Sequence, residues 1–146
     1  MTDLRELYQQ LILDHNQHPK NFKELENATA VAEGHNPLCG DEITLYLIVE
    51  NNQIQDISFK GSGCAISKAS ASIMTTLIKG KTVQEAEHLF QEFHKMITTG
   101  ETSDKMGKLA VLAGVHKYPS RVKCAILSWH TMNNALQGKE EPTKTE

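Results

Sequence analysis

Three cysteines and an aspartate are the residues of this sequence whose types and positions could support chemistry. Cys39 lies in the stretch "NPLCGDEI", and Asp41 follows it by two positions. Cys64 and Cys124 occur at wide spacing further along the chain. Thiolates and carboxylates are metal ligands, and zinc accepts three cysteines and one aspartate in tetrahedral geometry. One hypothesis is therefore a four-ligand metal site.

A second hypothesis needs no metal. Free cysteines are among the most frequently buried residue types, and no two of these cysteines have the spacing that makes a zinc motif specific. Gly40 and Gly63 stand beside two of the cysteines and indicate tight backbone turns. Asp41 precedes an apolar, strand-like run, where a carboxylate needs a partner. These features favour the metal site, but spacing alone leaves buried, unliganded thiols as an alternative.

Several cations could lie near the same place. Arg121 precedes Cys124 by three residues, so the two share one face if the segment is helical. The negative charge of thiolates and a carboxylate would compensate Arg121, although a solvated arginine at a helix start is the simpler interpretation. His35 and His116 lie in or near loops and could approach the site. Four other histidines are expected at the surface: His15, His18, His88 and His94.

The composition argues against several other classes of protein. The 146 residues predict a single domain, 1–146, without internal repeats. The net charge is −3 with no basic stripe, which argues against a nucleic-acid partner. No apolar run approaches the roughly 18 residues of a membrane span, and the charged N-terminus does not resemble a signal peptide. The low, odd number of cysteines favours a reducing, cytoplasmic location over a disulfide framework.

Apolar periodicity predicts the elements that position these residues in the first half of the chain. Residues 4–13 carry a helical stripe, whereas residues 20–40 are polar and are predicted as loop. Residues 42–60 alternate apolar and polar side chains about an Asn-Asn turn, which predicts a β-hairpin. A short third strand or bulge is expected to follow and to end at Cys64.

The second half is predicted to be helical. Helical spacing is found in residues 65–80, 82–97, 105–115 and 119–138, and the second of these opens with the capping-box sequence "TVQE". The charged tail, about 139–146, is expected to be disordered. A helix, antiparallel strands and then helices predict an α+β fold, with a small antiparallel three-stranded sheet packed by helices. In such a domain the three cysteine-bearing edges could gather at one end.

Four segments together resemble the NifU/IscU superfamily of iron–sulfur cluster assembly proteins: "LYQQLILDHNQHPKN", "PLCGD", "GSGCAISKASASIM" and "YPSRVKCAILSW". The resemblance runs from about Leu4 to Leu136, is greatest to the SufU branch, and implies a SufE/NifU-like fold. Scaffold proteins of the IscU branch carry a histidine directly before the third cysteine, where this sequence has Lys123. They also carry a Leu-Pro-Pro-Val-Lys chaperone signal, of which "YPSRVK" lacks the Leu-Pro-Pro part.

Resemblance to SufU implies a zinc ion held by Cys39, Asp41, Cys64 and Cys124. It also implies a sulfurtransferase that accepts persulfide sulfur from a SufS-type cysteine desulfurase, as its second substrate and activator, and serves downstream Suf-type cluster assembly proteins. Cys39 stands on the most mobile backbone and is predicted to take the sulfur, with Arg121 stabilising its thiolate. Two alternatives remain: a scaffold that transiently assembles a [2Fe–2S] iron–sulfur cluster on the same cysteines, and a non-catalytic structural zinc adaptor.

Overall fold

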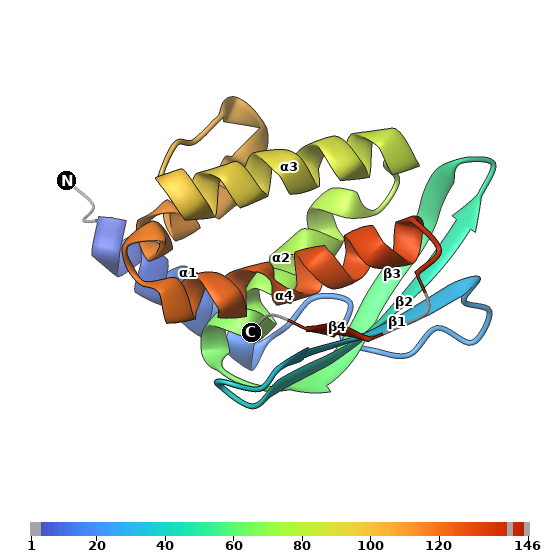
Figure 1. The fold of residues 1–146 in the computed structure, drawn as a ribbon, viewed down its shortest axis with the longest axis horizontal. Helices are drawn as coiled ribbons and strands as arrows, with labels where there is room; N and C mark the ends of the chain where they lie inside the picture. The colour runs from blue at the N-terminus through green and yellow to red at the C-terminus, as the bar shows by residue number, and fades with distance from the viewer. Residues whose placement is uncertain (1–3, 140–141, 145–146) are drawn as a thin grey trace.

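The computed structural model describes residues 4–139 and 142–144 of the chain. A helix comes first, three strands follow, and helical segments occupy most of the remaining chain (Figure 1). This order confirms the predicted α+β class. The elements are α1 (Leu4–Gln17), β1 (Ala30–Asn36), β2 (Asp41–Glu50), β3 (Gln53–Ser62), α2 (Ala65–Ile78), α3 (Val83–Thr99), the 3-10 segment η1 (Asp104–Lys117), α4 (Pro119–Leu136) and β4 (Thr143–Lys144).

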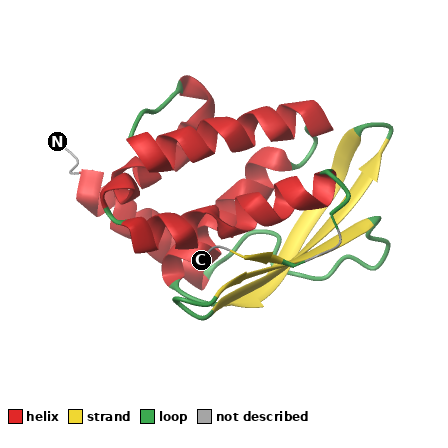
Figure 2. Ribbon diagram, viewed as in Figure 1, coloured by secondary structure: helices red, strands yellow, loops and turns green. Residues whose placement is uncertain are grey.

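The strands form a single sheet, and the helices lie on one side of it (Figure 2). The strand order is β3-β2-β1-β4, in which β1, β2 and β3 pair antiparallel and β4 runs parallel to β1. Helices α2 and α4 pack on the sheet, α1 packs on α2, and α3 and η1 pack on α4. In residues 4–139 and 142–144, every helix is too short or too polar to cross a membrane.

Strands β2 and β3 form the predicted hairpin. Ile43, Leu45 and Leu47 are buried, while the residues between them are at least partly exposed, as the alternating pattern predicts. Asn51 and Asn52 join the strands, and both have the positive φ that a tight hairpin turn of this kind requires. The short third strand expected just before the second cysteine is instead the end of β3.

Strand β1 corrects the prediction that residues 20–40 are loop. Its inward-facing positions hold small residues, Ala30, Ala32 and Gly34, and the outward-facing Val31 is 58% exposed. A Cβ atom added to Gly34 would overlap Oγ1 of Thr131 on α4, so the small side chains let the helix approach closely. The strand was missed because small inward residues do not produce a recognisable apolar alternation.

The predicted helix boundaries are largely confirmed. Thr82 and Glu85 form the expected capping box at the start of α3, each side chain bonding to the other's backbone N–H. Pro119 occupies the first turn of α4, where its missing N–H costs little. The helix expected at 105–115 is the longer 3-10 segment η1, and it is interrupted at Gly107.

Part of the C-terminal tail is ordered, which differs from the expectation of a disordered segment. Thr143 and Lys144 pair with Gly34 and His35 of β1. Thr143 is 7% exposed, and its hydroxyl accepts a 2.8 Å hydrogen bond from Asn134 Nδ2. The prediction for residues 140–141 and 145–146 lies outside the described residues.

Candidate metal centre

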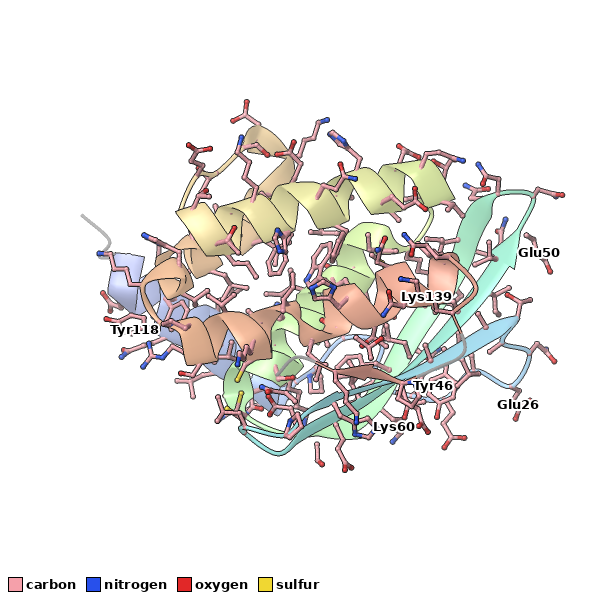
Figure 3. The ribbon with its side chains drawn as sticks, in the orientation of Figure 1. Glu26, Tyr46, Glu50, Lys60, Tyr118 and Lys139 are labelled. Carbon is pink, nitrogen blue, oxygen red and sulfur yellow. The ribbon has the colours of Figure 1, made fainter. Side chains whose placement is uncertain are left out.

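Three element ends meet at one end of the molecule and bring the predicted ligands together. Cys39 lies in the turn from β1 to β2, Asp41 begins β2, and Cys124 lies in the second turn of α4. One ligand atom from each of these three residues lies within 4.8 Å of the others, and the Cys39 and Cys124 sulfurs are 3.3 Å apart. Figure 3 labels Tyr118 where α4 begins, at this end, and Glu50 at the opposite end of the β2–β3 hairpin.

The fourth predicted ligand, Cys64, lies beside this group of three. Its Sγ is 3.8 Å from Asp41 Oδ2, although it is not within 4.8 Å of all three partners. Cys64 is the N-cap of α2, and its sulfur accepts a 3.4 Å hydrogen bond from the Ser67 N–H. A helix N-terminus favours negative charge, so this position suits a thiolate.

Asp41 is buried and held on both oxygens. It is 1% exposed, Oδ1 accepts the Cys64 N–H at 2.7 Å, and Oδ2 accepts Asn36 Nδ2 at 3.0 Å. The chain passes so close at Gly63, with φ of +154°, that an added Cβ would overlap Asp41 Oδ1. Position 63 must therefore be glycine, because a side chain there would collide with the carboxylate of Asp41.

Asn36 is a site residue that sequence reasoning missed. It ends β1, pairs with Asp41 across the sheet, and is fully buried. Its Nδ2 donates to Asp41 Oδ2 and, at 3.5 Å, to the sulfur of Cys124. The signal that could have found it is the two-residue alternation of a strand. If residues 30–36 are read as a strand, Ala32, Gly34 and Asn36 share the inward face, and a polar residue on that face indicates a special role.

The thiols of Cys64 and Cys124 influence each other. A hydrogen bond from the Cys124 thiol, helped by the Ser67 N–H, lowers the pKa of Cys64 to about 7 against the opposing effect of burial. The same hydrogen bond raises the pKa of Cys124, because Cys124 is the donor, and burial adds to the rise. In the metal-free chain Cys64 is thus the first of the two to become a thiolate.

Cys39 has much less support. It is exposed, and within the described chain its only side-chain hydrogen bond joins it to Cys124. The next residue, Gly40, has φ of +72°, and a Cβ added there would meet nothing within 4 Å. The turn therefore has open space around it.

The guanidinium of Arg121 packs against an aromatic ring at the start of α4. Its guanidinium carbon lies 4.6 Å from the ring centroid of Tyr118, a cation–π arrangement. The positive charge also opposes the burial that raises the pKa of Tyr8. Among the described residues, no hydrogen bond or ion pair joins Arg121 to Asp41 or to a cysteine. Its role toward the thiolates stays a prediction.

The histidines do not join the cluster of ligand atoms. His35 Nδ1 is 3.9 Å from a Glu42 oxygen, and His116 Nδ1 is 2.8 Å from the Ala113 carbonyl oxygen. The prediction that His15 is a surface residue is wrong: it is 7% exposed, and its Nδ1 lies 2.7 Å from Ser72 Oγ. The other three histidines expected at the surface are exposed, as predicted: His18, His88 and His94.

The donor set fits zinc. Tetrahedral zinc with Zn–S bonds of about 2.3 Å keeps its ligand atoms roughly 3.5–3.8 Å apart. The separations of 3.3 Å between Cys39 and Cys124 and of 3.8 Å between Cys64 and Asp41 lie close to that spacing. Thiolate sulfur with one carboxylate oxygen is also a set that zinc accepts and that magnesium or calcium does not prefer.

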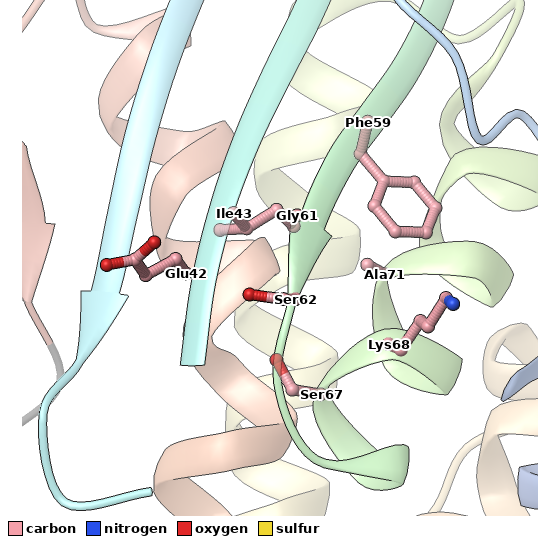
Figure 4. A pocket seen from close by; sticks show the side chains of 8 residues that line it. All are labelled: Glu42, Ile43, Phe59, Gly61, Ser62, Ser67, Lys68 and Ala71. Atoms are coloured by element: carbon pink, nitrogen blue, oxygen red, sulfur yellow. The ribbon is translucent and has the colours of Figure 1, made fainter. Parts of the chain in front are cut away.

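Two hollows lie near the predicted ligands. A crevice beside the start of α2, between Phe59, Ser67 and Lys68, holds only about 10 Å³, room for about one water molecule (Figure 4). A wider hollow of about 370 Å³ adjoins the Cys39 turn and is open to solvent. The residues that line it are His35, Asn36, Pro37, Gly40, Asp41, Glu42 and Lys144.

Comparison with known families agrees with the fold. A family model described as the NifU-like N terminal domain matches residues 7–125. The chain therefore belongs to the NifU-like N-terminal domain family.

Individual relatives within that family are similar over nearly the whole chain. The chain is 43% identical over 138 residues to the iron-sulfur cluster assembly scaffold protein IscU of Thermotoga maritima, covering 93% of this chain and 96% of that protein. It is 40% identical over 142 residues to the zinc-dependent sulfurtransferase SufU of Bacillus subtilis, covering 96% and 95%. A crystal structure of a putative scaffold protein for the SUF system from Fervidobacterium islandicum superposes with a TM-score of 0.84 at 40% identity, covering 89% and 96%.

Proposed function

We propose that this protein is a zinc-dependent sulfurtransferase of iron–sulfur cluster assembly, which takes persulfide sulfur from a SufS-type cysteine desulfurase. The observation that carries the proposal is the contrast within the cluster of ligand atoms. Cys39 is exposed on an open turn, whereas Asp41 and Cys124 are 1% and 3% exposed and share a hydrogen-bond donor. One ligand can reach a partner protein while the others stay in place.

The chain's own residues define the chemistry of transfer. The Cys39 thiolate attacks the outer sulfur of the desulfurase persulfide. The donor's S–S bond breaks, a new S–S bond forms at Cys39, and the desulfurase cysteine leaves as a thiolate, so that no oxidant or reductant is consumed. Among the described residues, release of Cys39 breaks the side-chain contact with Cys124, while Asp41 and Cys64 keep their hydrogen bonds to backbone N–H groups.

Zinc fits the four residues Cys39, Asp41, Cys64 and Cys124. When bound, it would keep cysteine sulfurs deprotonated at neutral pH and so store a nucleophile. Similarity to the zinc-dependent sulfurtransferase SufU of Bacillus subtilis supports this choice. Arg121, at the exposed start of α4, would stabilise the thiolate of Cys39 when that residue leaves the metal.

A scaffold that assembles a [2Fe–2S] cluster on the same residues is the second candidate. It is favoured by the similarity to proteins named IscU, such as that of Thermotoga maritima. Lys123 stands where IscU-type scaffolds place a histidine, and it lines a hollow near β4 with His130 and Thr143. Among the described residues, no hydrogen bond or ion pair joins Lys123 to a cysteine.

The metal content of protein purified without added metal, measured together with desulfurase turnover, tests the proposal. We expect about one zinc per chain, a large rise in alanine release when the protein is added, and one extra sulfur atom on Cys39 by mass spectrometry. Cys39→Ser should abolish the sulfur uptake. Leu38→Ala, a change at the exposed neighbour of Cys39, is the matched control and should leave persulfide chemistry intact.

Two results would contradict the proposal, one as a whole and one in part. Iron with acid-labile sulfide and no effect on turnover would reject the sulfurtransferase and favour the scaffold. Labelled sulfur uptake by Cys39→Ser, with none by Cys64→Ser, would show that Cys64 and not Cys39 accepts the sulfur.

A further inference from the structure

Asn36 connects the two structural halves of the metal centre. It ends β1, while the two residues that its amide contacts come from β2 and from α4. Its Nδ2 lies 3.0 Å from Asp41 Oδ2 and 3.5 Å from Cys124 Sγ. An amide group has two N–H donors, so both contacts can be made at once. In the described part of the chain, no other side chain donates to both of these ligand residues.

The environment of Asn36 indicates that its polar group is there for a reason other than filling space. The side chain is fully buried, and its Oδ1 has no hydrogen-bond partner within the described residues. A buried acceptor without a partner is destabilising, and an apolar residue of similar size would avoid that cost. The N–H donors must therefore provide something that an apolar residue cannot.

A donor to a ligand atom has two effects on a metal centre. It fixes the orientation of the ligand before the metal arrives, and it withdraws electron density from a thiolate or carboxylate. Hydrogen bonds to charged acceptors are also the stronger kind. Asp41 and Cys124 together receive these effects from Asn36, whereas Cys39 receives no contact from it among the described residues.

We propose that Asn36 is a positioning residue of the metal centre, whose amide fixes Asp41 and Cys124 as permanent ligands and leaves Cys39 as the exchangeable one. The inference rests on the proposed function, because it requires that these residues bind a metal. It adds a residue that lies outside the ligand set and divides that set into a fixed and a mobile part.

Two substitutions at Asn36 test the inference. Asn36→Leu keeps a side chain of similar size but has no hydrogen-bond donor and adds no charge, and Asn36→Ala removes the side chain beyond Cβ. Asn27→Ala, at an exposed asparagine in the loop before β1, is the matched control. Zinc affinity is measured by competition with a chromophoric chelator, and the cobalt-substituted proteins are compared by absorption spectroscopy.

We expect both Asn36 variants to bind zinc about 10- to 100-fold more weakly than the unaltered protein, the range found when an outer partner of a metal ligand is lost. The thiolate-to-cobalt charge-transfer bands should shift, because the Cys124 sulfur is no longer held by a donor. Asn27→Ala should match the unaltered protein in both measurements. A purely space-filling role would be preserved by Asn36→Leu and would leave the cobalt spectrum unchanged.

The outcomes separate this inference from the proposed function. If the unaltered protein binds neither zinc nor cobalt, the metal centre itself is rejected. If it binds both and Asn36→Leu binds them within about twofold with the same spectrum, the metal centre stands and the role of Asn36 is rejected. Should Asn36→Ala fail to fold, Asn36→Leu, which keeps the volume of the side chain, still decides between these results.

Discussion

Cys39 and Cys124 present the same thiol group 3.3 Å apart, in opposite surroundings. Cys124 is 3% exposed, lies within a helix and receives a hydrogen bond from a buried amide. Cys39 is exposed on a short turn between two strands. The proposed function requires one fixed ligand and one movable ligand, and a helix and a turn present thiols that differ in this way.

Replacing one cysteine at a time should give the largest difference between the two positions. We expect Cys124→Ser to weaken zinc binding by more than about 100-fold, beyond the effect of losing an outer partner. Cys39→Ser should weaken it less, because solvent reaches that position and a water molecule can fill it. Chelator competition on both variants gives the measurement. Equal losses would show that the two cysteines are held alike.

Substitutions at the two glycines beside the predicted ligands should have effects of intermediate size. Gly63→Ala would push a methyl group into Asp41 and force a strained φ, so we expect a loss of about 3 kcal/mol in the free energy of unfolding, together with weaker zinc binding. A methyl group at position 40 would meet open space, so Gly40→Ala should lower the free energy of unfolding by only about 1 kcal/mol, the cost of a left-handed φ. Chemical denaturation of the two metal-free variants measures both values. A greater loss for Gly40→Ala would contradict the division into a fixed and a mobile part.

The smallest expected effect concerns thiol acidity in the metal-free protein. The lowered pKa of Cys64, about 7, means that its thiolate is present above neutral pH and is lost as the pH falls below that value. Alkylation of Cys64 by iodoacetamide should therefore reach half its maximal rate near pH 7. Peptide mass spectrometry reports the rate at each cysteine. In denaturant the midpoint should move up toward about 8.5, the ordinary cysteine value; an unchanged midpoint would mean that the fold does not set the acidity.

Sequence patterns predicted those parts of the molecule in which each segment carries its own signal. The β2–β3 hairpin has alternating apolar residues, and α3 has its capping box at Thr82 and Glu85. Strand β1 carries no such signal. Its inward residues are small, which lets α4 pack closely against them but leaves no apolar alternation in the sequence. The strand can be recognised only from its packing against α4, about a hundred residues further along the chain. A local sequence pattern does not contain that information.

The candidate site divides in the same way. The residue types of Cys39, Asp41, Cys64 and Cys124 suggested ligands, and the structure brings three of them within 4.8 Å of one another with Cys64 alongside. Asn36 could not be found, because an asparagine before a proline is an ordinary loop residue until its strand is known. Contacts between distant segments, rather than composition, decide which polar residues support a site.

The short strand β4 also affects how copies of this chain meet one another. A strand at the border of a sheet presents unpaired N–H and C=O groups that can pair with another molecule and start aggregation. Thr143 and Lys144 pair with Gly34 and His35 and so occupy part of the border of β1 next to the metal centre. The last residues of the described chain thereby cover this part of the sheet border against pairing with another molecule.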